Sequence, residues 1–165
     1  MDESGVNVAL TRLYARAPRE VRAVGSVPQN YGQNLTVLAA LHHRGIRAAM
    51  LMPGATDGEV FQIFVERVLL PELKRGDTVV WDNLSAHKGF GVAEVLQAAG
   101  VSVYYLPPYS PDYNPMEQAW KIKTLLRAVG ARTRAHLQRA REAALTQVSA
   151  QDSRAWFKHC GYPLH

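Results

Sequence analysis

Two acidic residues lie next to predicted elements of secondary structure, where a folded domain can bring carboxylates together. Asp82 follows the apolar run 78–81 (TVVW), which predicts a short buried strand, and Glu117 lies in the first turn of a predicted helix. Carboxylates that converge from rigid elements are the ligands that hard divalent ions such as Mg²⁺ prefer. A pair of such ions supports displacement at phosphorus, one activating the attacking oxygen and the other stabilising the leaving oxygen. The candidate chemistry is therefore metal-dependent phosphoryl transfer.

Each acid also has a simpler interpretation. An aspartate at the end of a strand is often a turn residue or a cap, and a glutamate in the first turn of a helix is favoured by the helix dipole. An aspartate at position 2 can be a terminal acid without fixed partners. Taken one at a time, Asp82, Glu117 and Asp2 do not separate these interpretations from a metal site.

The elements that must position these acids follow from the spacing of the apolar residues. Residues 34–41 and 46–52 predict two strands that form a hairpin across the turn at 42–45. A capping box of Thr56 and Glu59 predicts the start of an amphipathic helix. Further strands are predicted at 78–81 and 101–106, and further helices at 92–99, 116–129, 133–148 and 152–159. Strands that alternate with helices late in the chain imply parallel pairing, so the predicted fold is α/β with a mixed sheet.

The helix predicted at 116–129 follows a rigid loop rich in proline. Asn114 is its expected N-cap, and Pro115 suits its first turn. The apolar residues of this helix form one arc, while Glu117 and Lys121 share the opposite face. A carboxylate and a lysine on the same stripe could meet a phosphate chain.

Composition and charge fit one globular domain with an anionic partner. The chain has 165 residues, of which 47% are hydrophobic, and a net charge of +5. Basic residues gather at 12–22 and 118–141, and the second segment contains no acid. Charge alone supports a solvated helix face and a nucleic-acid surface about equally. One cysteine, Cys160, excludes an internal disulfide, and neither a signal-peptide pattern nor a membrane-spanning run is found.

Several blocks of the sequence together resemble one family. Residues 2–5 (DESG), 81–88 (WDNLSAHK) and 106–120 (LPPYSPDYNPMEQAW) resemble the catalytic blocks of mariner-related bacterial insertion-sequence transposases, which are DDE superfamily enzymes. The 34 residues between Asp82 and Glu117 match the spacing of that branch. The resemblance spans essentially the whole chain, and the Asn-Pro-x-Glu block is its most specific part.

The resemblance implies a ribonuclease-H-like fold, an α/β domain over residues 1–165 with a mixed five-stranded sheet flanked by helices. It implies DNA strand cleavage and strand transfer during transposition, with Asp2, Asp82 and Glu117 as catalytic residues and as ligands of two Mg²⁺ or Mn²⁺ ions. The implied partners are double-stranded DNA (transposon ends and target) and further copies of the chain assembled on that DNA, in a bacterial cytoplasm at the nucleoid. We expect DNA binding by basic residues near these blocks: Lys121, Lys123, Arg127, His87, Lys88, Arg12 and Arg16.

The sequence departs from the family pattern at several places. Met1 alone precedes Asp2, where the family has an apolar strand, and the family's helix-turn-helix region is not found in this sequence. We therefore expect a truncated first strand that holds Asp2 poorly. The segment 121–123 is one residue shorter than the family pattern, which could rotate the basic face relative to Glu117, and Glu20 stands where glycine is expected.

These departures leave two alternatives to an active transposase domain. One is a truncated, catalytically inactive remnant that retains DNA or partner binding. The other is a nuclease of the same fold that acts on RNA–DNA hybrids. The Asn-Pro-x-Glu block and the spacing of 34 residues favour a transposase over a hybrid nuclease. Only a measured activity separates an active domain from a remnant, because both carry the three acids.

Overall fold

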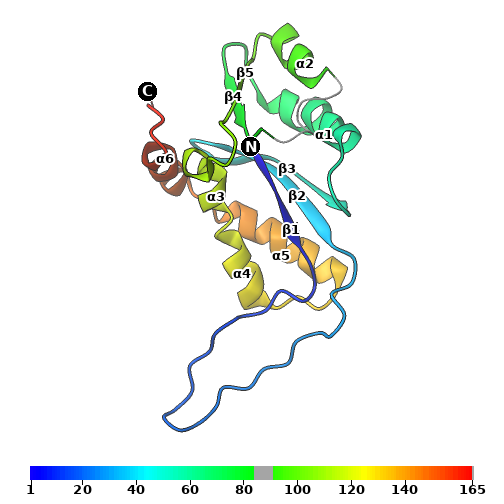
Figure 1. Cartoon of the computed structure of the whole chain (residues 1–165), viewed down its shortest axis with the longest axis vertical. Helices are drawn as coiled ribbons and strands as arrows, with labels where there is room; N and C mark the ends of the chain where they lie inside the picture. Colours follow the sequence, from blue (N-terminus) through cyan, green and yellow to red (C-terminus); the bar gives the residue numbers. More distant parts are fainter. Residues whose placement is uncertain (84–90, 165) are drawn as a thin grey trace.

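A computed structural model describes residues 1–83 and 91–164 of the chain (Figure 1). Its strands are β1 (Asp2–Val6), β2 (Leu35–His42), β3 (Gly45–Pro53), β4 (Thr78–Trp81) and β5 (Ser102–Tyr105). Its helices are α1 (Gly58–Phe64), η1 (Val65–Leu69), η2 (Leu70–Glu72), α2 (Val92–Ala98), η4 (Pro111–Tyr113), α3 (Pro115–Ala119), α4 (Ile122–Val129), α5 (Arg134–Thr146) and α6 (Ala150–His159). Within the described residues, no helix has the length and apolar character needed to cross a membrane.

The described strands form two sheets instead of the single five-stranded sheet expected. Strands β1, β2 and β3 are antiparallel neighbours in that order, whereas β4 and β5 pair in parallel. The predicted hairpin and the predicted parallel pairing are therefore confirmed. The two sheets meet where the amino group of Met1 donates a hydrogen bond to the carbonyl oxygen of Val80 at 2.6 Å. One such bond does not make a ladder, so β1 and β4 are close but are not paired strands.

The two faces of the three-stranded sheet belong to two separate apolar cores. Val37 and Ala39 of β2 pack in one core with residues of α3, α4 and α5. Leu38 and Ala40, which alternate with them, pack in the other core with residues of α1, β4 and α2. Figure 1 shows α4 beside α5 on one side of the sheet and α1 and α2 near β4 and β5. Since successive side chains of a strand point to opposite faces, β2 is buried on both sides.

The helix after the hairpin begins with a different cap from the one predicted. Asp57 is the N-cap of α1, and its Oδ1 accepts a hydrogen bond from the Val60 amide at 2.9 Å. The Thr56 hydroxyl instead points to the sulfur of Met52 at 4.0 Å. The predicted capping box of Thr56 and Glu59 is therefore wrong. Asp57 satisfies the free amide and also places a negative charge at the positive end of the helix dipole.

The helix predicted at 116–129 is two helices, α3 and α4, which break at Trp120. At the break, amides bond the carbonyl oxygen three residues earlier instead of four. The Lys121 amide donates to the Gln118 oxygen at 3.2 Å, and the Thr124 amide donates to the Lys121 oxygen at 2.8 Å. The side chains of Trp120 and Lys121 both bond to acids far away in the sequence. These distant partners set the change of direction, which the local sequence pattern does not contain.

A long arm, residues 7–34, joins β1 to β2 and extends away from the rest of the domain (Figure 1). Arg132 holds its base, because its Nη1 donates to the backbone oxygens of Val8 at 3.2 Å and Leu10 at 3.3 Å. Within the arm, Glu20 has a φ of 67°, in the left-handed region that favours glycine. This backbone conformation explains why glycine suits position 20 better than glutamate.

Candidate active site

Asp2 lies at the start of β1, with its carboxylate buried against the segment that carries α3. Its Oδ2 accepts hydrogen bonds from Asn114 Nδ2 at 3.1 Å and Trp120 Nε1 at 3.0 Å, and its Oδ1 accepts one from the Glu3 amide at 2.7 Å. All five residues of β1 also pair with β2. The expectation that Asp2 is poorly held is therefore wrong. The side chains that hold this carboxylate, Asn114 and Trp120, lie at the start and at the end of α3.

Burial raises the pKa of Asp2, and the negative charge of Asp82 raises it further. The hydrogen bonds from Trp120 and the Glu3 amide oppose the shift, because they stabilise the charged form. Burial also lowers the pKa of the Met1 amino group to about 6, although Asp2 and Asp82 both act to raise it. The buried carboxylate of Asp2 is thus electrostatically linked to Asp82, and the positive charge of the Met1 amino group acts to lower its pKa.

Asp82 and Glu117 bring two further carboxylates to the same region. Asp82 is half-buried directly after β4, and Glu117 is exposed in the first turn of α3. The pKa of Glu117 is raised, first by partial burial and then by the negative charges of Asp2 and Asp82, while Lys123 lowers it. Because interactions between charges fade with distance, the effects of Asp82 on Asp2 and of both aspartates on Glu117 join the three acids in one electrostatic group.

Asp82 and Glu117 line a hollow of about 360 Å³, and the proline-rich loop forms its wall. The other lining residues are Asn83, Leu106, Pro107, Pro108, Tyr109, Ser110, Pro111 and Asn114. Asn114 therefore touches both the hollow and the carboxylate of Asp2. In the described part of the chain, no three carboxylate, imidazole or thiol side chains are grouped to hold one metal ion.

Lys121, one of the residues expected to bind DNA, is engaged with α6. Its Nζ lies 3.0 Å from Asp152 Oδ1 and 4.5 Å from the centroid of the Trp156 ring. The break between α3 and α4 also separates it from the helix that carries Glu117. The prediction that Glu117 and Lys121 share one helical stripe is therefore wrong.

The other basic residues expected to bind DNA fall on two parts of the molecule. Lys123 and Arg127 are half-buried on α4, and Lys123 is near enough to the glutamate of α3 to lower its pKa. Arg12 and Arg16 are exposed on the arm. The pair His87-Lys88 lies outside the described residues. The structure thus brings Lys123 near Glu117, whereas the two arginines lie on the arm.

The sequence predicts Asn114 as a helix cap, and it does not predict the role of Trp120. Both hold Asp2, across 112 and 118 residues of the chain. Asn114 has two functions at once, since its Oδ1 accepts from the Met116 amide at 3.1 Å while its Nδ2 donates to Asp2. The signal in the sequence was their position, because both lie within three residues of Glu117.

Asn114→Ala is expected to lower the free energy of unfolding by about 2–4 kcal/mol. The change removes an N-cap, worth about 1 kcal/mol, and a hydrogen bond to a buried carboxylate, worth about 1.5–3 kcal/mol. Urea unfolding measures the difference. Asn30→Ala on the exposed arm serves as the control, with an expected change within about 0.5 kcal/mol. A loss below about 1 kcal/mol in Asn114→Ala would contradict its double role.

The described fold is similar to several solved transposase structures. The Mos1 mariner paired end complex with Mn has a TM-score of 0.70 at 15% identity, over 96% of this chain and 50% of that chain. The Mos1 Strand Transfer Complex has a TM-score of 0.68 at 13% identity, over 96% and 48%. The Mos1 transposase catalytic domain with raltegravir and Mg has a TM-score of 0.65 at 15% identity, over 78% and 71%. The chain thus spans about half the length of the first two. The comparison with curated protein sequences found no match.

These likenesses define the class of fold: a mixed α/β domain, ribonuclease-H-like, similar to the catalytic domain of a mariner transposase. The amino-acid sequence identifies the family to which the chain belongs. Residues 1–150 match the family described as DDE superfamily endonuclease, so the chain belongs to that family.

Proposed function

We propose that the chain is the catalytic domain of a DDE transposase, which cleaves DNA strands and transfers them to a target during the movement of an insertion sequence. The observation that carries the proposal is the electrostatic grouping of Asp2, Asp82 and Glu117 beside a hollow of about 360 Å³. Membership of the DDE superfamily endonucleases supports it, and so does the likeness to the Mos1 paired end and strand transfer complexes.

The charge of Asp82 raises the pKa of Asp2, and the charges of Asp2 and Asp82 raise the pKa of Glu117, so divalent cations would stabilise this group of carboxylates. Asp2 has the acceptor capacity for this, because a carboxylate offers about four lone-pair sites and the hydrogen bonds from Glu3, Asn114 and Trp120 use three of them. The donor set is entirely carboxylate oxygen, which suits Mg²⁺ or Mn²⁺. We infer that Asp2, Asp82 and Glu117 hold two such ions, which would activate the attacking oxygen and stabilise the leaving oxygen. Mos1 structures that contain Mn or Mg support this choice of metal.

The three acids differ in how freely they move. Asp2 is buried and accepts three hydrogen bonds, so its carboxylate is a fixed point of the site. Asp82 is half-buried at the end of β4, and Glu117 is exposed in the first turn of α3. Glu117 can therefore change its side-chain conformation to follow the substrate, whereas Asp2 cannot. Each acid acts as a metal ligand only in its charged form.

DNA would approach the hollow along the basic residues of α4 and the arm. The candidates are accessible at least in part: Lys123, Arg127, Arg12 and Arg16. Lys121 donates a hydrogen bond to Asp152, and this bond lowers the pKa of Asp152. Lys121 would therefore bind a phosphate only after this hydrogen bond is broken. Contacts of this kind set affinity and its salt dependence without reading sequence.

We further propose that copies of the chain assemble as a homo-oligomer on double-stranded DNA, at both transposon ends and at the target. Mos1 transposase forms a paired-end complex with a transposon end, which supports such an assembly. The resemblance to bacterial insertion-sequence transposases would place this activity at the nucleoid in a bacterial cytoplasm.

A second function is a domain that binds DNA or a partner without cleaving DNA. One observation favours it: within the described residues the acids are not grouped to hold a single ion. In that case the basic residues alone would determine binding.

Nicking of supercoiled plasmid in Mg²⁺ or Mn²⁺ separates the two functions. The wild-type chain is expected to convert the plasmid to nicked circles only with metal, and Asp82→Asn is expected to leave it intact. Asp57→Asn is a matched control, because Asp57 caps α1, and asparagine is also a good N-cap. No nicking by the wild-type chain, together with retained DNA binding, would instead support the second function.

The effect of pH on stability should change sign when metal is added. The pKa values of Asp2 and Glu117 are higher in the folded chain than in the unfolded chain. Their contribution to the free energy of unfolding is therefore fully present below the unfolded-state pKa. That contribution is lost as pH rises through the folded pKa. Without metal, acidification through the folded-state pKa values towards the unfolded-state values should therefore strengthen it. With metal at about 100 times its Kd, a gain of about 2.7 kcal/mol is expected near neutral pH and should vanish on acidification.

Thermal unfolding with and without Mg²⁺, at neutral and acidic pH, measures this reversal. The chelated protein at each pH is the control for every other titrating group. An Mg²⁺-induced rise in Tm that is equally large at acidic pH would contradict binding to these two acids.

A further inference from the structure

The hollow beside Asp82 and Glu117 has two chemically different parts. Its acidic part carries these two carboxylates, at the end of β4 and in the first turn of α3. The rest of its described lining is mainly apolar and comes from the proline-rich loop, residues 106–114: Leu106, Pro107, Pro108, Tyr109 and Pro111. No basic residue is found among the described residues of this lining. The loop therefore suits the uncharged ring of a ligand better than a phosphate group.

Tyr109 differs from the rest of this loop because its backbone is strained while its ring is exposed. Its φ of 55° lies in the left-handed region, where a bulky side chain is rare. The ring is fully exposed, so burial of its surface does not offset the cost of that backbone conformation. Strain of this kind is common at ligand sites, where it holds a side chain in place for its partner. The geometry of Tyr109 therefore indicates a ring that contacts a ligand.

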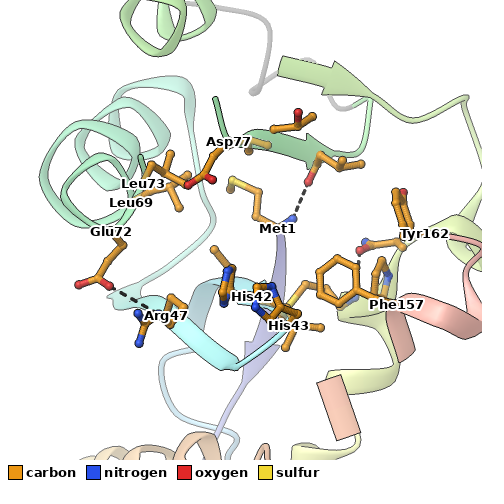
Figure 2. A pocket seen from close by; sticks show the side chains of 18 of the residues that line it. Met1, His42, His43, Arg47, Leu69, Glu72, Leu73, Asp77, Phe157 and Tyr162 are labelled. Carbon is orange, nitrogen blue, oxygen red and sulfur yellow. Dashed lines mark hydrogen bonds and ion pairs between the residues drawn. The ribbon is translucent and has the colours of Figure 1, made fainter. Parts of the chain in front are cut away.

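The loop holds this tyrosine in a fixed position. Three prolines surround it, and each fixes its own φ. The Ser110 hydroxyl donates a hydrogen bond to the Pro108 carbonyl oxygen at 3.3 Å. Near the far end of the loop, the Tyr162 hydroxyl donates to the Tyr113 carbonyl oxygen at 2.8 Å. Figure 2 shows Tyr162 beside Phe157, and their rings make an edge contact at 5.8 Å between centroids. A ring on such a rigid loop loses little conformational entropy when it binds a ligand.

A nucleobase suits this part of the hollow if the base is unpaired. Every base has a flat face that stacks on an aromatic ring, and this stacking strengthens binding whatever the sequence. Within a duplex the bases are already stacked on one another, so only a base that leaves the duplex can reach the ring. A base on Tyr109 would bring its own phosphate near Asp82 and Glu117, because all three residues line the same hollow.

We propose that the hollow binds one unpaired nucleobase of a DNA strand, stacked on Tyr109, with the adjoining phosphate at the carboxylates of Asp82 and Glu117. This inference rests on the proposed function, because it takes the same hollow as the place of strand cleavage. Tyr109 binds the base and so fixes the phosphate of one nucleotide beside the acids. The preferred substrate is therefore DNA that is already unpaired at this nucleotide.

The probes are two duplexes of about 20 base pairs that differ only in one additional, unpaired thymine, titrated against the whole chain in Ca²⁺. The wild-type chain is expected to bind the duplex with the unpaired thymine about tenfold more tightly, because one base stacks on the ring. This preference should be lost in Tyr109→Ala and kept in Tyr109→Phe, which retains the ring. Since the ring is exposed, both variants should keep the fold and the wild-type affinity for the paired duplex.

Tyr113→Ala is the matched control. Tyr113 belongs to the same loop and is also exposed, but it is not part of the described lining of the hollow. This variant should keep the wild-type preference for the unpaired thymine. In a second measurement, iodouracil replaces that thymine, and irradiation links it to the aromatic ring on which it stacks. The crosslinked residue, located by peptide mass, is expected to be Tyr109.

The same preference in Tyr109→Ala as in Tyr113→Ala, or a crosslink to a different residue, would overturn the stacking site. Because these measurements record binding, they separate this inference from the proposed cleavage. Plasmid nicking by a wild-type chain that shows no preference would overturn the stacking site alone. A preference that depends on Tyr109, in a chain that does not nick DNA, would overturn the proposed cleavage alone.

Discussion

Asp2→Asn is expected to reduce metal-dependent plasmid nicking by roughly a thousandfold or more, which is about 4 kcal/mol of activation free energy. Asparagine keeps the shape of the side chain but removes the negative charge that a divalent ion requires. The loss should equal that of Asp82→Asn, because Asp2 is fixed by Asn114, Trp120 and the Glu3 amide. Rates of nicking at saturating Mg²⁺ measure the effect.

The same variant separates a catalytic role from a structural one. Asparagine has one acceptor oxygen, so its amide nitrogen must face either the Glu3 amide or the donors of Asn114 and Trp120. An unsatisfied pair of donors costs about 1–3 kcal/mol. Burial disfavours the charged form and raises the pKa of Asp2, so removal of this charge offsets part of that cost. The net change in the free energy of unfolding should therefore stay within about 2 kcal/mol.

Glu3→Gln is the matched control for this experiment. Glu3 is the next residue of β1, and its side chain points to the opposite face of the sheet from Asp2. Its replacement removes a charge of the same sign nearby and should leave nicking within about threefold of wild type, roughly 0.7 kcal/mol. If the Asp2→Asn variant keeps more than a tenth of the wild-type nicking rate, Asp2 is not a metal ligand.

Features coded by neighbouring residues could be predicted from the sequence. The hairpin of β2 and β3 and the parallel pair of β4 and β5 form where the spacing of apolar residues places them. Asn114 caps α3 as its type and position predict, and Gly100, with a φ of 76°, follows the end of α2. Asp82 and Glu117 stand at the ends of such local elements, which is why their approach could be predicted.

Features coded by contacts across the chain could not be predicted in the same way. The burial of Asp2 depends on Asn114 and Trp120, which lie more than a hundred residues away. Lys121 turns to Asp152, and this contact helps to divide one predicted helix into two. The separation of the sheets likewise depends on where β4 lies relative to β1, and periodicity carries no information about that distance.

Trp81→Ala is expected to lower the free energy of unfolding by about 3–5 kcal/mol, the range for removal of a fully buried aromatic side chain. Trp81 is completely buried and makes edge contacts with Phe61 at 5.3 Å and Tyr105 at 5.7 Å between ring centroids. These contacts hold β4 against α1 and β5, and Asp82 is the next residue. The total free energy of unfolding of a domain is about 5–15 kcal/mol, so this loss is a large fraction of the stability.

Urea unfolding of Trp81→Ala and of Tyr109→Ala measures how much of this loss comes from burial. Tyr109 is also aromatic but fully exposed, at 102%, so its change should stay within about 0.5 kcal/mol. Trp81→Phe keeps a ring against Phe61 and Tyr105 and should cost less than half as much as alanine. If Trp81→Ala retained its stability but lost metal-induced stabilisation, Trp81 would act mainly by positioning Asp82. Loss of both together, with recovery of both in Trp81→Phe, would mean that the core beneath β4 and the carboxylate at its end form one cooperative unit.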